Sequence, residues 1–321
     1  MKIIVLDGYT LNPGDNPWSE LEALGELTVY DRTPRAEIFE RASKAEIVLT
    51  NKTPLDAGTL ERLPALKFIS VLATGYNVVD TDAARRLGIP VSNVPEYGTS
   101  SVSQHVLAMM LHFARQCELH SQRVHEGQWR HCNDFCFWKT PQVELVGKRL
   151  GIVGFGRIGR CVGRLAHALG MEVIAFDVQR NEPPDYTPFA WRSVEEIFAE
   201  SDFVTMHCPQ TAENAGMVNR GLLEQMQPHA IFINTARGGL VNEEDLAIAL
   251  NQGKIGGAAL DVLSVEPPSA DNPLLQARNC LITPHIAWAT LEARRRLMAI
   301  TVENVRGFLQ GTPRNVVNAG P

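Results

Sequence analysis

The 321-residue sequence has no apolar run long enough for export or for a membrane span. At the N-terminus, MKIIVLDGY contains only four consecutive apolar residues before Asp7, too few for the apolar region of a signal peptide. No later stretch reaches the roughly 18 uninterrupted apolar residues that indicate a transmembrane helix. The sequence therefore predicts a cytoplasmic protein without a membrane partner.

Cysteine and basic residues are also scarce. The 30 basic residues are outnumbered by 36 acidic ones, and the net charge of −6 argues against nucleic acid or anionic lipid as partners. The cysteines show no disulfide framework, and in a chain with room for its own core they are expected to be reduced thiols. They occupy positions 117, 132, 136, 161, 208 and 280.

What is present is typical of a folded globular protein. Apolar residues make up 45% and charged residues 21%, which excludes long disorder, collagen and coiled coil. At about 150 residues per domain, the length predicts about two domains. No internal repeat is found, which excludes a solenoid.

Short apolar runs alternate with amphipathic stretches, which favours a doubly wound α/β sheet or two such sheets. The runs before residue 95 and those after residue 147 indicate separate sheets. The expected strands are Ile3–Leu6, Ile47–Leu49, Phe68–Leu72, Val91–Val94, Leu150–Val153, Val173–Phe176, Phe203–Met206, Ile231–Asn234 and Leu281–Thr283. The expected helices include Trp18–Leu24, Thr59–Leu63, Ile158–Leu169, Asn242–Asn251 and Leu291–Leu309, with one long helix from Thr99 to about Glu126.

The clearest motif is a glycine-rich loop between a strand and a helix, with the form G-x-G-x-x-G. Gly154 would allow the tight turn, Gly156 the approach of backbone to a diphosphate, and Gly159 close packing of helix and strand. The helix N-terminus, with Arg157 and Ile158, would face the negative charge. This placement predicts a dinucleotide site.

An acidic residue stands where a ribose hydroxyl would need an acceptor. Asp177 follows the next strand, 18 residues after Gly159. Its charge would repel a 2′-phosphate, so NAD is favoured over NADP. The positive charge of Arg180, close in sequence, argues in the opposite direction. Cys208, before Pro209, could contact the adenine or be a small buried residue.

Three further strands are followed by chemically active groups. These are Arg237 in Thr-Ala-Arg-Gly-Gly, Glu266 in Val-Glu-Pro-Pro, and His285 in Thr-Pro-His. The carboxyl ends of parallel strands share one edge, so the three can converge there. Arginine suits a carboxylate or carbonyl oxygen, and a carboxylate beside a histidine favours the protonated imidazole that can act as an acid. Singly, each could also be a loop charge, a turn residue or a helix cap.

Taken in order, these motifs resemble the NAD-dependent D-2-hydroxyacid dehydrogenase family over nearly the whole chain. The resemblance implies Arg237 as the substrate-binding residue, Glu266 as the partner of the histidine and His285 as the acid/base. It also implies cofactor contacts from Thr235, Ala236 and Asp261, with Asp261 fixing the nicotinamide amide. The implied architecture is a flavodoxin-like substrate domain of residues 1–98 and 290–321, a Rossmann nucleotide domain of residues 99–289, and a cleft between them. The long helix from Thr99 would belong to a homodimer interface.

Within that family, three segments most resemble glycerate dehydrogenases, also called hydroxypyruvate reductases. They are Thr50-Asn51-Lys52, Ala73 to Asp80 and Asp134 to Trp138. The resemblance implies that Ala73, Thr74, Gly75 and Tyr76 offer amides to the substrate carboxylate. Trp138 would shape the pocket, within one subunit or across a dimer, or lie in a core. The sequence departs from many relatives at Gln104, where they have Glu.

Other interpretations stay open. The substrate could be lactate, phosphite or formate, or the chain could be an NAD-sensing corepressor or scaffold without enzymatic activity. His120, His125, His131, Cys132 and Cys136 match no standard zinc spacing, so no metal is expected. The run Arg294 to Arg296 is expected to lie on a solvated helix face.

Overall fold

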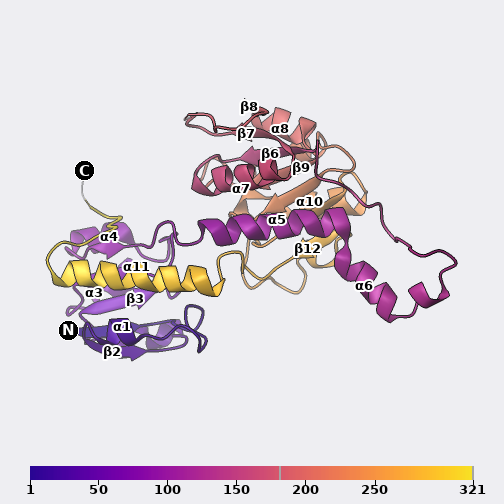
Figure 1. Cartoon of the computed structure of the whole chain (residues 1–321). Helices are drawn as coiled ribbons and strands as arrows, with labels where there is room; N and C mark the ends of the chain where they lie inside the picture. Colours follow the sequence, from indigo (N-terminus) through magenta and orange to yellow (C-terminus); the bar gives the residue numbers. More distant parts are fainter. Residues whose placement is uncertain (181, 320–321) are drawn as a thin grey trace. The chain divides into compact units, whose positions relative to one another are not determined.

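The computed structural model describes residues 1–180 and 182–319, and its chain divides into two compact units. Unit 1 comprises Met1–Gly98 and the segment from Trp288 onward, and unit 2 comprises Thr99–Ala287. Each unit is built on one parallel sheet with helices on both faces (Figure 1). The expectation of two parallel α/β sheets is confirmed.

Unit 1 has a five-stranded sheet in the order β2-β1-β3-β4-β5. Helices α2, α3 and α4 bury apolar residues against one face, and α1 and α11 against the other. The strands are β1 (Lys2–Val5), β2 (Glu26–Val29), β3 (Ile47–Thr50), β4 (Phe68–Val71) and β5 (Val91–Ser92). The helices are α1 (Ser19–Glu22), α2 (Ile38–Ala42), α3 (Ala57–Glu61), α4 (Thr81–Arg86) and α11 (Leu291–Leu309).

Unit 2 has a seven-stranded sheet in the order β12-β11-β10-β9-β6-β7-β8, and every pairing is parallel. The strands are β6 (Arg149–Val153), β7 (Glu172–Phe176), β8 (Phe189–Trp191), β9 (Phe203–Met206), β10 (Ile231–Asn234), β11 (Gly257–Leu260) and β12 (Cys280–Ile282). The helices are α5 (Thr99–Arg115), α6 (Cys117–His125), α7 (Arg157–Ala168), α8 (Val194–Glu200), α9 (Arg220–Leu223) and α10 (Glu243–Asn251).

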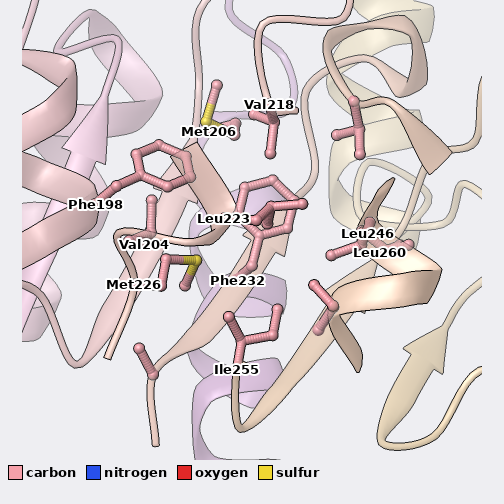
Figure 2. Close-up of a cluster of buried hydrophobic side chains, with 14 of the residues drawn as sticks. Phe198, Val204, Met206, Val218, Leu223, Met226, Phe232, Leu246, Ile255 and Leu260 are labelled. Atoms are coloured by element: carbon pink, nitrogen blue, oxygen red, sulfur yellow. The ribbon is translucent and has the colours of Figure 1, made fainter. Parts of the chain in front are cut away.

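Two apolar layers hold the helices of unit 2 to its sheet. Successive side chains of a strand point to opposite faces, so Phe232 and Ile233 enter different layers. Phe232 lies under α8, α9 and α10, where Phe198, Leu223 and Leu246 surround it (Figure 2). Ile233 lies under α5 and α7. Burial on both faces explains why these strands read as continuous apolar runs.

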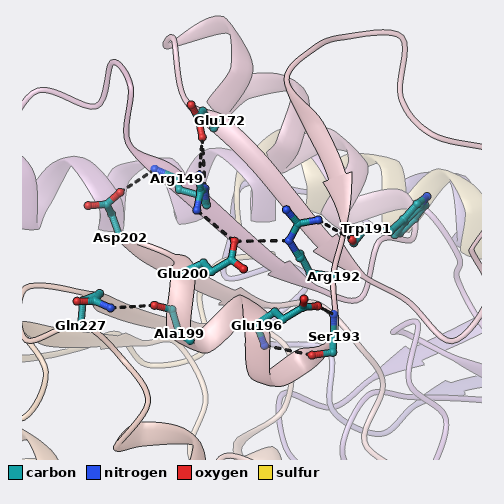
Figure 3. Close-up of polar contacts among 10 residues, drawn as sticks. All are labelled: Arg149, Glu172, Trp191, Arg192, Ser193, Glu196, Ala199, Glu200, Asp202 and Gln227. Carbon is teal, nitrogen blue, oxygen red and sulfur yellow. Dashed lines mark hydrogen bonds and ion pairs between the residues drawn. The ribbon is translucent and has the colours of Figure 1, made fainter.

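Ion pairs fasten the amino ends of the central strands. Arg149, at the start of β6, contacts Glu172 at 3.0 Å and Glu200 at 3.2 Å, and its backbone N–H donates to Asp202 at 2.8 Å (Figure 3). The N-terminus of α8, which follows the carboxyl end of β8, is capped reciprocally by Ser193 and Glu196. The ion pairs of Arg149 lie at the amino edge of the sheet, and the carboxyl edge carries the predicted site.

The helix expected from Thr99 to Glu126 is wrong as one continuous element, because it is interrupted at Gln116 and continues as a second helix. Helix α5 ends at Arg115, and Gln116 adopts a left-handed conformation with φ of 47° before α6 begins. The buried stripe of α5 extends to Ala114, whereas no residue of α6 is buried. Because the second segment packs against no core, nothing holds it to the axis of the first.

Of the run Arg294 to Arg296, Arg295 and Arg296 are exposed as expected, but Arg294 does not lie on a solvated face. It is only 8% exposed, and its guanidinium donates to both carboxylate oxygens of Asp15 at 2.5 and 2.7 Å. These hydrogen bonds lower the pKa of Asp15. The pairing connects α11 to the loop after β1, a contact across almost the entire length of the sequence.

The strands absent from the expected set have simple causes. Strands β2 and β8 lie at sheet edges and are only partly buried. Strand β11 has the sequence GAAL, which lacks β-branched residues. Glycine suits its first position, because a Cβ on Gly257 would lie 2.4 Å from the ring of Phe113 in α5. None of the helices that the structure describes has the length and apolar character needed to span a bilayer.

Candidate functional site

The predicted nucleotide and catalytic residues of unit 2 lie at one edge of its sheet. All seven strands are parallel, so their carboxyl ends face the same way. Strand β6 pairs with both β7 and β9, and ligands of doubly wound sheets bind at such a reversal of strand order. The residues that follow these strands are Gly154 after β6, Asp177 after β7, Cys208 and Pro209 after β9, Thr235 to Arg237 after β10, Asp261 after β11, and His285 after β12.

The three glycines of the loop meet three different constraints. Gly154 has φ of +96°, and a Cβ there would lie 2.4 Å from the backbone N of Cys208. A Cβ on Gly159 would lie 2.2 Å from the carbonyl oxygen of Gly154. A Cβ on Gly156 would meet nothing within 4 Å. Gly156 is therefore not required by the protein's own packing, which fits the approach of a diphosphate.

The start of α7 is suited to an anion. Gly156 is its N-cap and supplies no side-chain hydrogen bond to the first turn. Arg157 is exposed, and Ile158 is partly buried against the core beneath α5 and α7. Backbone N–H groups at a helix N-terminus, together with the helix dipole, favour negative charge.

Asp177 has a structural task that the sequence did not reveal. One carboxylate oxygen accepts from the N–H of Phe155 at 2.7 Å, inside the glycine turn, and the other accepts from Gln179 at 3.0 Å. A carboxylate has about four acceptor positions, so capacity remains for ribose hydroxyls. Arg180 is exposed.

Two polar groups line the same edge. The hydroxyl of Thr235 is buried, and no described residue gives it a hydrogen-bond partner, which suits a group that a cofactor would satisfy. Burial raises the pKa of the Cys208 thiol, so it stays protonated, and it packs against the core as a small apolar residue. Pro209 is exposed beside it. The glycine turn, the uncapped helix and Thr235 together fit a dinucleotide.

Asn234, a residue not singled out from the sequence, shapes the loop of Arg237. Its side chain donates to the carbonyl of Arg237 at 2.8 Å and accepts from the N–H of Ala236 at 3.0 Å. A Cβ on the following Gly238 would lie 1.9 Å from the carbonyl carbon of Leu263. The glycine therefore lets this loop touch the loop that leads to Glu266. An asparagine as the last residue of a buried β-strand run was the available signal.

The structure brings together the predicted histidine and glutamate. Nδ1 of His285 lies 2.6 Å from one carboxylate oxygen of Glu266, and the other oxygen accepts from the N–H of Leu263 at 3.1 Å. Both side chains are about one-third exposed, His285 at 32% and Glu266 at 34%. Since a carboxylate only accepts, Nδ1 carries a proton and Nε2 remains for chemistry.

Asp261 is buried at 1% exposure, and its carboxylate holds the segment around His285. It accepts from the hydroxyl of Thr283 at 2.6 Å and from the N–H groups of Ile286 at 2.8 Å and Ala287 at 2.9 Å. These contacts explain how a buried charge is tolerated. The contact with a nicotinamide amide remains a prediction.

In unit 1, two side-chain hydrogen bonds hold the loop after β4. The hydroxyl of Thr74 donates to the carbonyl of Val94 at 2.9 Å, and the Asn93 side chain donates to the carbonyl of Thr74 at 2.8 Å. Among the described residues, none accepts a hydrogen bond from the amides of Thr74, Gly75 or Tyr76. These amides are therefore available to a ligand carboxylate.

The structure does not gather the group of His120, His125, His131, Cys132 and Cys136 into one cluster of ligands. Nδ1 of His120 lies 2.7 Å from the carbonyl of Gln116, and its Nε2 accepts from the N–H of Lys139 at 3.0 Å. Within residues 1–180 and 182–319, no cluster of three or more His, Cys, Asp or Glu could hold a metal ion. His120 instead attaches the segment of Trp138 to α6.

Fold and site together define a dinucleotide-binding α/β protein. Residues 107–287 match the family described as D-isomer specific 2-hydroxyacid dehydrogenase, NAD binding domain. The chain is 49% identical over 321 residues to a hydroxypyruvate reductase of Blautia hydrogenotrophica, covering 99% of this chain and 100% of the relative. It is 40% identical to a glycerate dehydrogenase of Methylorubrum extorquens, covering 99% of each chain.

A solved structure is similar over the whole length. It is the D-lactate dehydrogenase of Aquifex aeolicus complexed with NAD and lactic acid, with 27% identity, full coverage of both chains and a TM-score of 0.84. The chain therefore belongs to the D-isomer-specific 2-hydroxyacid dehydrogenases, and it is an NAD-dependent oxidoreductase.

Replacing Gly156 by Ala directly tests whether the loop from Gly154 to Gly159 binds the diphosphate. The added methyl group has free space in the protein, so the melting temperature is expected to stay within a few degrees of wild type. It would project where the diphosphate approaches, so the Kd for NADH, measured by fluorescence titration, should rise about tenfold or more. Gly58→Ala is the matched control, because its Cβ also has room in α3 and it belongs to unit 1, whereas the glycine loop belongs to unit 2. Equal NADH affinity in Gly156→Ala and wild type would contradict the assignment.

Replacing Asp177 by Asn tests the ribose role. The amide oxygen can still accept from Phe155, so the turn is kept while the negative charge is lost. The ratio of kcat/KM for NADH to that for NADPH should fall by about tenfold or more, since repulsion of the 2′-phosphate is removed. An unchanged ratio would count against Asp177 as the selecting residue.

Proposed function

We propose that this protein reduces a short 2-oxo acid, hydroxypyruvate or glyoxylate, to the D-2-hydroxy acid with NADH, and catalyses the reverse reaction. The observation that carries the proposal is the 2.6 Å pair of His285 and Glu266 at the same sheet edge as Arg237 and the glycine turn. The names of the two relatives, matched over almost their full length, support hydroxypyruvate as substrate.

We assign the cofactor to unit 2 and the substrate carboxylate to unit 1. Gly154, Gly156, Gly159 and the start of α7 would hold the diphosphate, and Asp177 the adenosine ribose. Thr235, Ala236, Asp261, Cys208 and Pro209, with Arg157 and Ile158, complete the proposed cofactor contacts. Ala73, Thr74, Gly75 and Tyr76 are the proposed ligands of the substrate carboxylate.

Each residue of the site has a separate role in the proposed reaction. NADH, when bound, supplies the hydride to the carbonyl carbon. Nε2 of His285 donates the proton that the carbonyl oxygen takes up, and Glu266 stabilises the protonated imidazole through Nδ1. Arg237 uses one N–H on the carbonyl of Ala236 at 2.7 Å, and its remaining donors are available to polarise the substrate.

A homodimer in the cytoplasm is the proposed state of the protein. The segment after α6 carries strongly exposed aromatic side chains, with Phe135 at 89% and Trp138 at 66% exposure. Apolar side chains gathered on one segment are typical of an interface. All six cysteines are free, which fits a reducing compartment.

Substitution of His285 by Ala separates catalysis from binding. Loss of the proton donor should lower kcat for 2-oxo acid reduction by about 10²-fold or more. The Kd for NADH should change little, because the glycine turn is intact. His125→Ala, at an exposed position of α6, is the control with wild-type kcat expected. A His285→Ala enzyme with undiminished turnover would refute the acid/base assignment.

A panel of small acids tests the substrate. NADH oxidation should be fastest, in kcat/KM, with hydroxypyruvate or glyoxylate, and slower with pyruvate, because similar proteins are named hydroxypyruvate reductase and glyoxylate reductase. Oxidation of lactate, phosphite and formate with NAD should be measured alongside. A preference for one of these three would move the protein to another specificity, and no turnover with any acid would favour an NAD-sensing scaffold.

A further inference from the structure

Two side chains near the start of α5 contact the segment that carries His285. The hydroxyl of Ser101 donates to the carbonyl of Ala287 at 2.5 Å. Nε2 of His105 lies 3.1 Å from the hydroxyl oxygen of Thr283. Residues four apart share one face of a helix, so a single face of α5 holds the segment on both sides of His285.

The direction of each hydrogen bond in this group follows from its chemistry. The carboxylate of Asp261 can only accept, so the single proton of the Thr283 hydroxyl goes to Asp261, at 2.6 Å. The Thr283 oxygen must therefore accept from His105, whose proton lies on Nε2. The same nitrogen is 3.6 Å from the Asp261 carboxylate. His105 thus donates to Thr283, and Thr283 in turn donates to the buried carboxylate of Asp261.

His285 itself has a backbone that needs support. Its φ is +54°, a left-handed conformation that is uncommon for residues other than glycine. Its N–H donates to the carbonyl of Asp261 at 2.8 Å and to that of Thr283 at 2.9 Å. Such a conformation persists when the surroundings determine it, and here Asp261 binds the residues before and after His285.

We propose that His105 is a positioning residue for the dehydrogenase reaction, acting through Thr283 and Asp261 to fix the turn of His285. The proposal rests on the function assigned above. Packing alone gives no reason for histidine here, because the buried residues Val102, Val106 and Met109 of α5, all within four positions of it, are apolar. A leucine would fill the space and leave Thr283 without its donor.

The test compares variants that keep or remove each hydrogen bond. His105→Leu and Thr283→Val remove the contact at similar volume, whereas His105→Gln and Thr283→Ser keep a group able to make it. We expect His105→Leu and Thr283→Val each to lower kcat with the preferred 2-oxo acid by about 10- to 100-fold, the scale of a small misplacement of a catalytic group. The Kd for NADH should stay within about twofold of wild type, and the Gln and Ser variants should recover most of kcat.

A double variant tests whether His105 and Thr283 act together, and a variant at a neighbouring position is the control. If both side chains act in one chain, His105→Leu combined with Thr283→Val should lose no more activity than either alone. Gln104→Ala, at an exposed neighbouring position of α5, should match wild type.

Three results would overturn the proposal: full kcat in His105→Leu, equal loss in His105→Gln and His105→Leu, or multiplicative losses in the double variant. Should His105→Leu fail to fold, the Gln, Val and Ser variants decide by the same comparison. A wild-type enzyme inactive on every 2-oxo acid would reject the proposed function and this role with it, whereas an active wild type with an unaffected His105→Leu rejects the positioning role alone.

Discussion

The parallel arrangement of the larger sheet is the constraint on which the site depends. Because every strand of unit 2 runs the same way, the loops after six of its strands begin at one edge. That edge receives the glycine turn, Asp177, Arg237 and His285, although more than 130 residues separate the first from the last in sequence. The apolar layers on both faces fix the strands, and the strands fix where these loops start.

Buried polar groups then shape the individual loops. Asn234 and Asp261 are almost fully buried at the ends of β10 and β11, where each satisfies backbone groups of a loop. A buried polar side chain is stable only when its hydrogen bonds are made, so each forces one geometry on the chain around it. The positions of Arg237 and His285 therefore follow from interior residues rather than from the surface loops alone.

Site residues that belong to a short sequence motif were predictable from the sequence. The glycine turn, Asp177 and the strand-end residues follow from short-range spacing, and the family comparison agrees with the class they indicated. The bend at Gln116 was not predictable, because α6 still has helical sequence but lacks a core to pack against. Nor was the burial of Arg294, whose partner Asp15 is far away in the chain.

The sequence by itself determined two parallel α/β sheets, a dinucleotide loop and the set of residues able to carry hydride-transfer chemistry, because these depend on residue type and spacing along one segment. Only the tertiary structure decided that Arg294 pairs with Asp15, that Asp177 also holds its glycine turn, and that α5 reaches Thr283. Such contacts join segments through the packing of a common core, and no local pattern encodes the partner.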